Sequence, residues 1–120
     1  MDTESALRAL SALSQPHRLA IFRWLVQQQP AACPVGEIGA EMELAPATLS
    51  FHLERLEQAG LVEIRTEGRR RLCSPRLETM RALVSWLLAD CCQGRPEACG
   101  EVLAALGETD TDCGISERPS

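Results

Sequence analysis

The sequence has no apolar run that approaches the ~18 residues of a membrane-spanning helix, so we expect no membrane-embedded segment. Its first residues, Met1–Ser5, show no basic region followed by an apolar core, so we expect no secretory signal and a cytoplasmic protein. Thiols stay reduced in the cytosol. The six cysteines therefore favour metal or redox chemistry over a disulfide framework.

Lysine is also absent, so all 12 basic side chains are arginines. Arginine suits bidentate contacts with phosphates, although GC-rich coding would give the same composition. The net charge of −5 argues against indiscriminate nucleic-acid binding, but the charge is unevenly distributed. Residues 62–87 carry six arginines and three acids, net +3, whereas residues 1–61 carry −3 and residues 88–120 carry −5. Residues 62–87 are thus the one basic segment of the chain.

One helical pattern, at residues 45–61, carries the main candidate for a binding surface. Leu49, Leu53 and Leu56 recur at i, i+4 and i+7, so they lie on one face of a helix. Gly60 predicts its end, since glycine just past a helix readily takes a left-handed conformation. Off the apolar face lie four side chains with donors of the kind that read base edges and phosphates: Thr48, Ser50, His52 and Arg55. We expect this helix to read a DNA groove; the alternative is an ordinary surface helix.

The elements around this helix predict a winged helix-turn-helix, mainly α with a small β-hairpin. Helices are expected over residues 3–13, 16–26 and 36–43, and a tight turn at residues 44–46 joins the third of these to the candidate reading helix. Residues 61–66 and 69–74 then read as two strands joined at Glu67–Gly68. This hairpin is the expected wing, with three arginines placed along DNA phosphates: Arg69, Arg70 and Arg71. The alternative for these arginines is a solvated edge strand protected against aggregation.

A last long helix is expected over Leu77–Cys92. Its apolar stripe has no later core element to cover it, which indicates subunit contact; a second subunit would also help a chain of this size, which buries only a modest core. Gly94 and Pro96 supply a stop signal. We therefore expect a DNA-binding and dimerisation domain over residues 1–106 and a disordered acidic tail over residues 107–120.

The run from Ser50 to Val62, SFHLERLEQAGLV, together with the Pro16–Phe22 segment and the arginine-rich hairpin, resembles the arsenical-repressor (ArsR/SmtB) family. The resemblance covers about residues 6–92. It implies a homodimeric winged-helix repressor whose first and last long helices join the subunits, and which releases operator DNA when an effector binds. It also implies that Ser50 and His52 lie on the DNA-reading face.

The common effector sites of that family do not carry over to this sequence. The region before the reading helix has Cys33 alone in place of a Cys-x-Cys pair, and residues 77–92 contain no histidine. Cys91, Cys92 and Cys99 instead resemble an arsenite-responsive subgroup with a Cys-Cys pair and a third cysteine after the last helix. Zinc prefers four ligands, and no fourth histidine or cysteine ligand lies nearby in the sequence. Three soft thiolates instead suit an ion that takes three sulfurs, such as trivalent arsenic or antimony.

The sequence-based hypothesis is therefore a repressor released by arsenite or antimonite bound to Cys91, Cys92 and Cys99. Rivals of the same fold are a thiol-redox or persulfide sensor and a cadmium or lead sensor. A winged helix that binds protein remains another alternative, and Cys91 can also be a small buried hydrophobe. The absence of a Cys-x-x-Cys motif and of alternating strands and helices argues against an enzyme. We expect Cys33 and Cys73 to be structural and Cys113 to lie outside the site.

Overall fold

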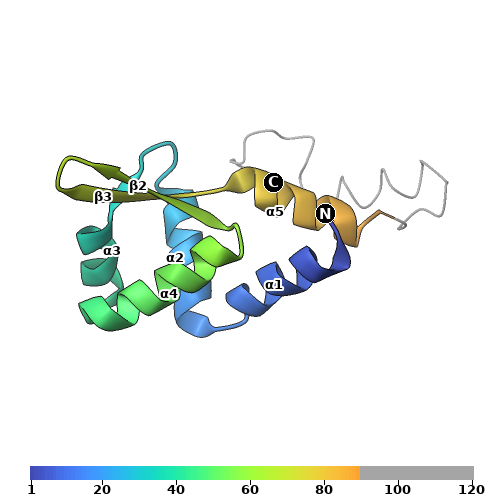
Figure 1. Ribbon diagram of the computed structural model, residues 1–120, viewed down its shortest axis with the longest axis horizontal. Helices are drawn as coiled ribbons and strands as arrows, with labels where there is room; N and C mark the ends of the chain where they lie inside the picture. The colour runs from blue at the N-terminus through green and yellow to red at the C-terminus, as the bar shows by residue number, and fades with distance from the viewer. Residues whose placement is uncertain (90–120) are drawn as a thin grey trace, which may run out of the picture. The chain divides into compact units, whose positions relative to one another are not determined.

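The structure is a computed structural model that describes residues 1–89 of the chain. Its contacts divide the chain after Trp86, and the unit Met1–Trp86 is described below. No helix in residues 1–89 is long and apolar enough to cross a membrane. Figure 1 shows the elements in chain order: α1 (Thr3–Leu13), α2 (Pro16–Gln27), β1 (Cys33–Pro34), α3 (Val35–Met42), α4 (Pro46–Gln58), β2 (Val62–Glu67), β3 (Arg70–Pro75) and α5 (Leu77–Leu87).

The predicted helices and hairpin are confirmed, with two differences. The segment between α2 and α3, for which the sequence predicts neither helix nor strand, contains β1, which pairs antiparallel with β3 in a sheet of order β1-β3-β2. A two-residue strand is too short to show alternation in the sequence. The last helix, expected to run to Cys92, ends at Leu87, and Leu88 and Ala89 form a turn. Gly94 and Pro96 would prevent a helix from continuing past them, but they do not prevent it from ending earlier, as α5 does at Leu87.

The core forms where α4 packs against α1, α2, α3 and β2. Leu49, Leu53 and Leu56 of α4 are at most 3% exposed, as their spacing predicts. They meet the fully buried side chains of the neighbouring elements, which include Ile21, Leu25, Ile38, Leu61 and Val62. The leucine row therefore fixes which side of α4 faces outward.

The backbone of α3 at Gly39 lies close to the side chain of Leu49 on α4, and this contact sets the packing of the two helices. A Cβ atom on Gly39 would lie 3.2 Å from Leu49 Cδ2 and 3.5 Å from the Leu44 carbonyl oxygen. The turn between the helices is closed by the Leu44 N–H, which donates to the Gly39 carbonyl at 3.0 Å. This part of the sequence therefore encodes a tight helix–turn–helix unit.

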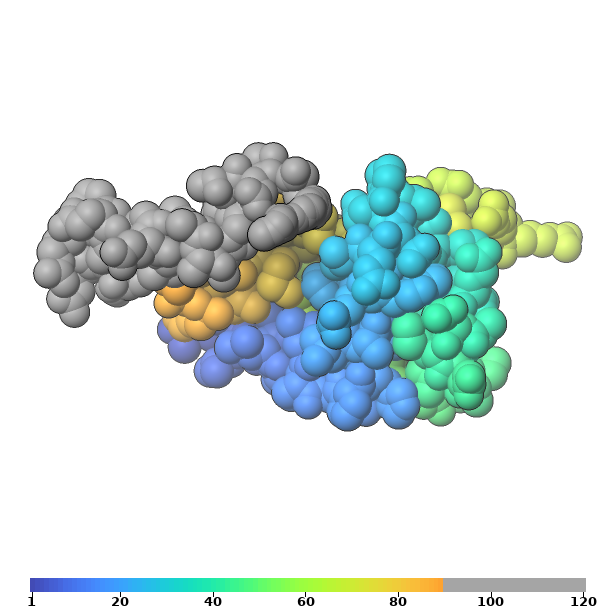
Figure 2. Space-filling model, turned by 180° about the vertical axis from the view of Figure 1, so that it is seen from behind, coloured from blue at the N-terminus to red at the C-terminus, as the bar shows by residue number. Residues whose placement is uncertain are grey.

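The helices α1 and α5 lie side by side, as both the ribbon and the space-filling view show (Figures 1 and 2). Ala6 and Ala9 of α1 are fully buried and Leu83 of α5 is 3% exposed, so these faces belong to the core. Other apolar side chains on the same helices remain exposed, among them Leu7 (60%) and Val84 (37%). This pair of helices thus leaves apolar surface uncovered in the single chain.

The end of α4 gives a test of the local fold. Gly60 follows the helix with φ +77°, a region that an L side chain enters at a cost of about 1 kcal/mol. We expect Gly60→Ala to lower the free energy of unfolding by about that amount in urea denaturation. The matched control is Gly36→Ala in α3, where a Cβ meets nothing within 4 Å, and which should be neutral or slightly stabilising. Equal stability of Gly60→Ala and wild type would contradict this description of the helix end.

Candidate nucleic-acid interface

The donors predicted on α4 divide between its two flanks. Successive helical residues turn by about 100°, so Ser50 and Arg55 project on opposite sides of the direction set by the leucine row. Thr48 shares the side of Arg55 by the same count. All three are exposed, which agrees with their expected place off the apolar face.

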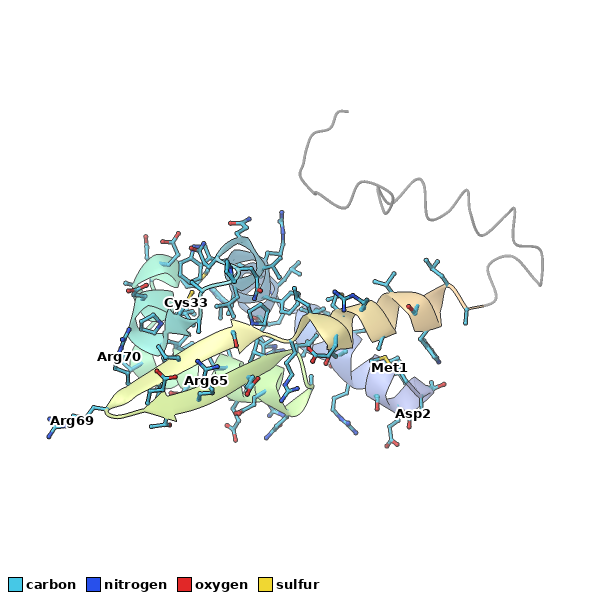
Figure 3. The ribbon with its side chains drawn as sticks, turned by 90° about the horizontal axis from the view of Figure 1, so that it is seen from above. Met1, Asp2, Cys33, Arg65, Arg69 and Arg70 are labelled. Atoms are coloured by element: carbon cyan, nitrogen blue, oxygen red, sulfur yellow. The ribbon has the colours of Figure 1, made fainter. Side chains whose placement is uncertain are left out.

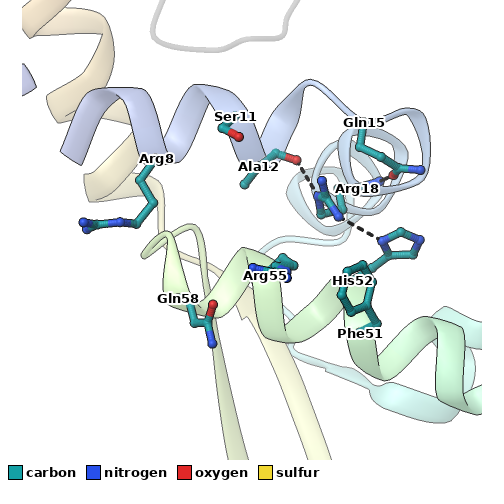
Figure 4. Close-up of a pocket in the computed structure, with 9 residues that line it drawn as sticks. All are labelled: Arg8, Ser11, Ala12, Gln15, Arg18, Phe51, His52, Arg55 and Gln58. Carbon is teal, nitrogen blue, oxygen red and sulfur yellow. Dashed lines mark hydrogen bonds between the residues drawn. The ribbon is translucent and has the colours of Figure 1, made fainter. Parts of the chain in front are cut away.

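His52 does not lie on the outer face, and that part of the prediction is wrong. It is 6% exposed, because it is three residues after Leu49 and four before Leu56 and so shares their row. Arg18 Nη1 lies 3.2 Å from His52 Nδ1, and Arg18 Nε donates to the Ala12 carbonyl at 2.8 Å (Figure 4). Since a guanidinium only donates, Nδ1 accepts, and the neutral ring carries its proton on Nε2. His52 therefore helps to hold α4 against the α1–α2 corner.

The outermost ridge of α4 carries residues that the sequence analysis missed. Residue 51 lies about 200° around the helix from Leu49, so the leucine spacing alone already placed Phe51 outward. Phe51 is 47% exposed, and the Arg55 Cζ lies 5.0 Å from its ring centroid. Glu54 and Gln58 are also exposed, and Gln58 Nε2 donates to Glu54 Oε2 at 3.5 Å. The ridge offers an aromatic face and both donors and acceptors.

On the flank that carries Ser50, α4 borders a groove of about 390 Å³ shared with α3. We call this the wing-side groove; its lining includes Gly36, Leu44, Ser50 and Arg71. Arg71 comes from the hairpin, so the structure brings a predicted phosphate contact beside a predicted base-reading residue. Ser50 and Arg71 are 21 positions apart in the sequence.

The hairpin of β2 and β3 projects beyond the body of residues 1–86 (Figures 1 and 2). Arg69 follows the turn at Gly68, which has φ +65°, and points away from the body (Figure 3). Arg70 and Arg71 are exposed on β3 and pair in register with Glu67 and Thr66. The three arginines expected on the wing are therefore free to meet an external anion.

Two buried thiols face each other in the small sheet. Cys33 of β1 and Cys73 of β3 are directly paired residues, 5% and 0% exposed. Burial raises the pKa of Cys33, and burial together with the nearby Cys33 raises the pKa of Cys73 to about 12. Both thiols therefore stay protonated at neutral pH, which fits the expected structural role.

The predicted metalloid ligands, Cys91, Cys92 and Cys99, lie outside the described residues, as does Cys113. Within residues 1–89 no group of three His, Cys, Asp or Glu side chains is placed to hold a metal ion. The described part of the chain thus offers a polar and basic surface rather than a metal centre.

The α3–turn–α4 unit followed by the β2–β3 hairpin defines a winged helix-turn-helix. A model of the helix-turn-helix domain family matches residues 13–65. The chain is 32% identical over 88 residues to an uncharacterized HTH-type transcriptional regulator of Bacillus subtilis, YceK, covering 72% of this chain and 86% of that protein.

Solved structures agree with that match. A winged helix-turn-helix DNA-binding domain from Mycobacterium bovis, reported as homodimeric and as a possible ArsR-family regulator, is 28% identical with a TM-score of 0.59, covering 72% of this chain and 80% of that one. The transcriptional regulator HlyU from Vibrio vulnificus is 30% identical with a TM-score of 0.56, and the match covers 75% of this chain and 91% of HlyU. The chain belongs to the ArsR-type family of helix-turn-helix transcriptional regulators.

The buried imidazole predicts a pH dependence of stability. Burial lowers the pKa of His52 below its ordinary 6.5, and Arg18 and His17 lower it further. As the pH falls through 6.5 the unfolded chain binds a proton that the folded chain does not, so the free energy of unfolding falls. We expect wild type to lose stability relative to His52→Gln, whose amide oxygen still accepts from Arg18, between about pH 7.5 and about pH 5.5 in urea denaturation. Parallel pH curves would contradict the buried neutral imidazole.

Proposed function

We propose that the protein is a transcriptional regulator that binds operator DNA through α4 and the wing. The observation that carries this proposal is the exposed polar ridge of α4 together with three exposed arginines on the wing, Arg69, Arg70 and Arg71. An α-helix fits the major groove, and base edges there are read by donors and acceptors such as Thr48 and Ser50. The wing arginines supply phosphate contacts that position the helix without reading sequence.

We further propose that it acts as a homodimer joined through α1 and α5. The exposed apolar side chains on these helices, which include Leu7, Leu10 and Val84, would be covered by the same surface of a second copy. Two copies would present two α4 helices to two half-sites of a palindromic operator. The similar domain from Mycobacterium bovis is homodimeric, which supports a dimer but does not identify its interface.

The wing gives a direct test of DNA binding. Each phosphate contact releases counterions, so log K falls with log salt at a slope of about −0.9 per contact. We expect neutralisation of Arg69, Arg70 and Arg71 to glutamine to weaken binding and to make that slope shallower by about 2–3 units. The measurement is fluorescence anisotropy with a duplex that the protein has selected from a random pool. Arg23→Gln on α2 is the control for loss of charge; an unchanged slope in the wing variant would contradict the assignment.

The effector part of the proposal rests on the donor set in the sequence. Cys91, Cys92 and Cys99 would bind arsenite or antimonite, since three soft thiolates match an ion that takes three sulfurs. Neighbouring residues on a helix point about 100° apart, so joint ligation by Cys91 and Cys92 requires a distorted or ended helix. Ligation would then alter the segment after α5 and the spacing of the two α4 helices. Effector and DNA would disfavour each other reciprocally, typically by ~1–3 kcal/mol.

Single cysteine variants test this site. We expect arsenite to release the wild-type protein from duplex DNA. Three single variants should bind DNA as wild type does but should not be released by arsenite: Cys91→Ser, Cys92→Ser and Cys99→Ser. Cys113→Ser is the matched control and should respond like wild type. Anisotropy before and after arsenite measures both properties in one titration.

Two other outcomes would redirect the proposal. Release by peroxide or polysulfide but not by arsenite, with a disulfide or persulfide detected by mass spectrometry, would establish the redox alternative. Release by cadmium or lead alone would establish the metal-ion alternative. A wild-type complex unaffected by any of these would contradict a thiol-based effector site.

A further inference from the structure

A second basic surface lies across α4 from the wing. A cavity of about 600 Å³ opens between α1, the α1–α2 corner and α4 (Figure 4). We call it the α1–α4 pocket; three of its lining residues are arginines, Arg8, Arg18 and Arg55. The remaining lining residues that matter here are the amides Gln15 and Gln58 and the ring of Phe51. No acidic side chain lines it.

The three arginines of the pocket have no carboxylate partner within residues 1–89. The ion pairs in that part of the chain involve other arginines, Arg65 with Glu67 and Arg76 with Glu63. Three like charges around one cavity raise its positive potential, since no acidic side chain lines it. The pocket is therefore built to attract an anion.

Arg18 adds directional donors to this charge. It is half-buried, and it uses Nε for the Ala12 carbonyl and one Nη1 hydrogen for His52. A guanidinium has five N–H donors, so three remain without an acceptor in residues 1–89. His52 does not add to this charge, because its lowered pKa favours the neutral ring. Because two hydrogen bonds fix the orientation of this guanidinium, its remaining N–H donors can form bidentate hydrogen bonds with an oxyanion.

We propose that the α1–α4 pocket is an oxyanion site that takes a phosphate group. Arginine matches phosphate oxygens in bidentate geometry, and the pocket presents three arginines from three helices. The amides of Gln15 and Gln58 can donate to the same group. The residues of this site differ from the wing arginines and from the proposed thiol ligands.

Operator DNA can supply that phosphate, in which case the proposal rests on the function proposed above. A helix with its side chains is about 10–12 Å across and fills a major groove about 12 Å wide. Its two flanks then face the two phosphate backbones. The wing-side groove with Arg71 meets one backbone, and the α1–α4 pocket with Arg8 and Arg55 meets the other. A free phosphate or phosphate ester is the second source of the same chemistry.

Arg8 is the residue that tests the pocket most cleanly. It has no hydrogen bond or ion pair within residues 1–89, so Arg8→Gln leaves the described contacts intact. Arg23→Gln, an exposed arginine on α2 outside the pocket, is the matched control. Arg18→Lys keeps the charge but removes the fork, and its fold is checked by circular dichroism. Size-exclusion chromatography of all variants verifies an unchanged oligomeric state.

The first arm uses the full chain without DNA. Inorganic phosphate is titrated at constant ionic strength against chloride, and amide shifts are followed by NMR. A free-phosphate site gives saturating shifts at residues around the α1–α4 pocket in wild type and Arg23→Gln, and loses them in Arg8→Gln and Arg18→Lys. This titration contains no DNA, so it tests phosphate binding in the pocket even if the protein does not bind duplex DNA.

The second arm uses the selected duplex. A backbone phosphate in the pocket predicts that Arg8→Gln weakens binding roughly fivefold and makes the salt slope shallower by about 0.9, uniformly across duplex sequences. Arg23→Gln should match wild type. A positive DNA arm alone identifies the DNA backbone as the source; competition of phosphate with DNA, lost in Arg8→Gln, identifies a free ligand. No pocket-dependent effect in either arm overturns the proposal.

Discussion

The burial of three leucines on α4 is the constraint on which the rest of the structure depends. Leu49, Leu53 and Leu56 lock one side of the helix into the core formed with α1, α2, α3 and β2. Because a helix is rigid, this contact also fixes its opposite ridge and both flanks. One flank borders a groove that Arg71 of the wing also lines, and the other contacts the α1–α2 corner through His52 and Arg18. The placement of every candidate DNA contact on α4 follows from that single apolar row.

Most of the fold was predictable because its elements are local and strongly patterned. The leucine period, Gly60 and the Glu67–Gly68 turn gave the reading helix and the hairpin nearly residue by residue. The features that the sequence analysis assigned wrongly or missed are the place of one side chain and contacts between distant segments. His52 was assigned by its polar chemistry although its position in the leucine row places it inside. The α1–α4 pocket and the Cys33–Cys73 pairing depend on contacts between distant segments, which the period of one helix cannot reveal.

The charge distribution reconciles an acidic chain with an anionic partner. A net charge of −5 disfavours general attraction to DNA, while arginines gathered on the wing and around the α1–α4 pocket favour it locally. Binding then requires the protein to present one particular face.

Phosphate ethylation interference on the selected duplex tests the central claim, that α4 enters a major groove, most directly. The account predicts that modification blocks binding at phosphates on both sides of one major groove in each half-site. It also predicts that the positions repeat after about one helical turn, as a dimer with two reading helices requires. Interference confined to the edges of a minor groove, or absent at every position, would contradict the account.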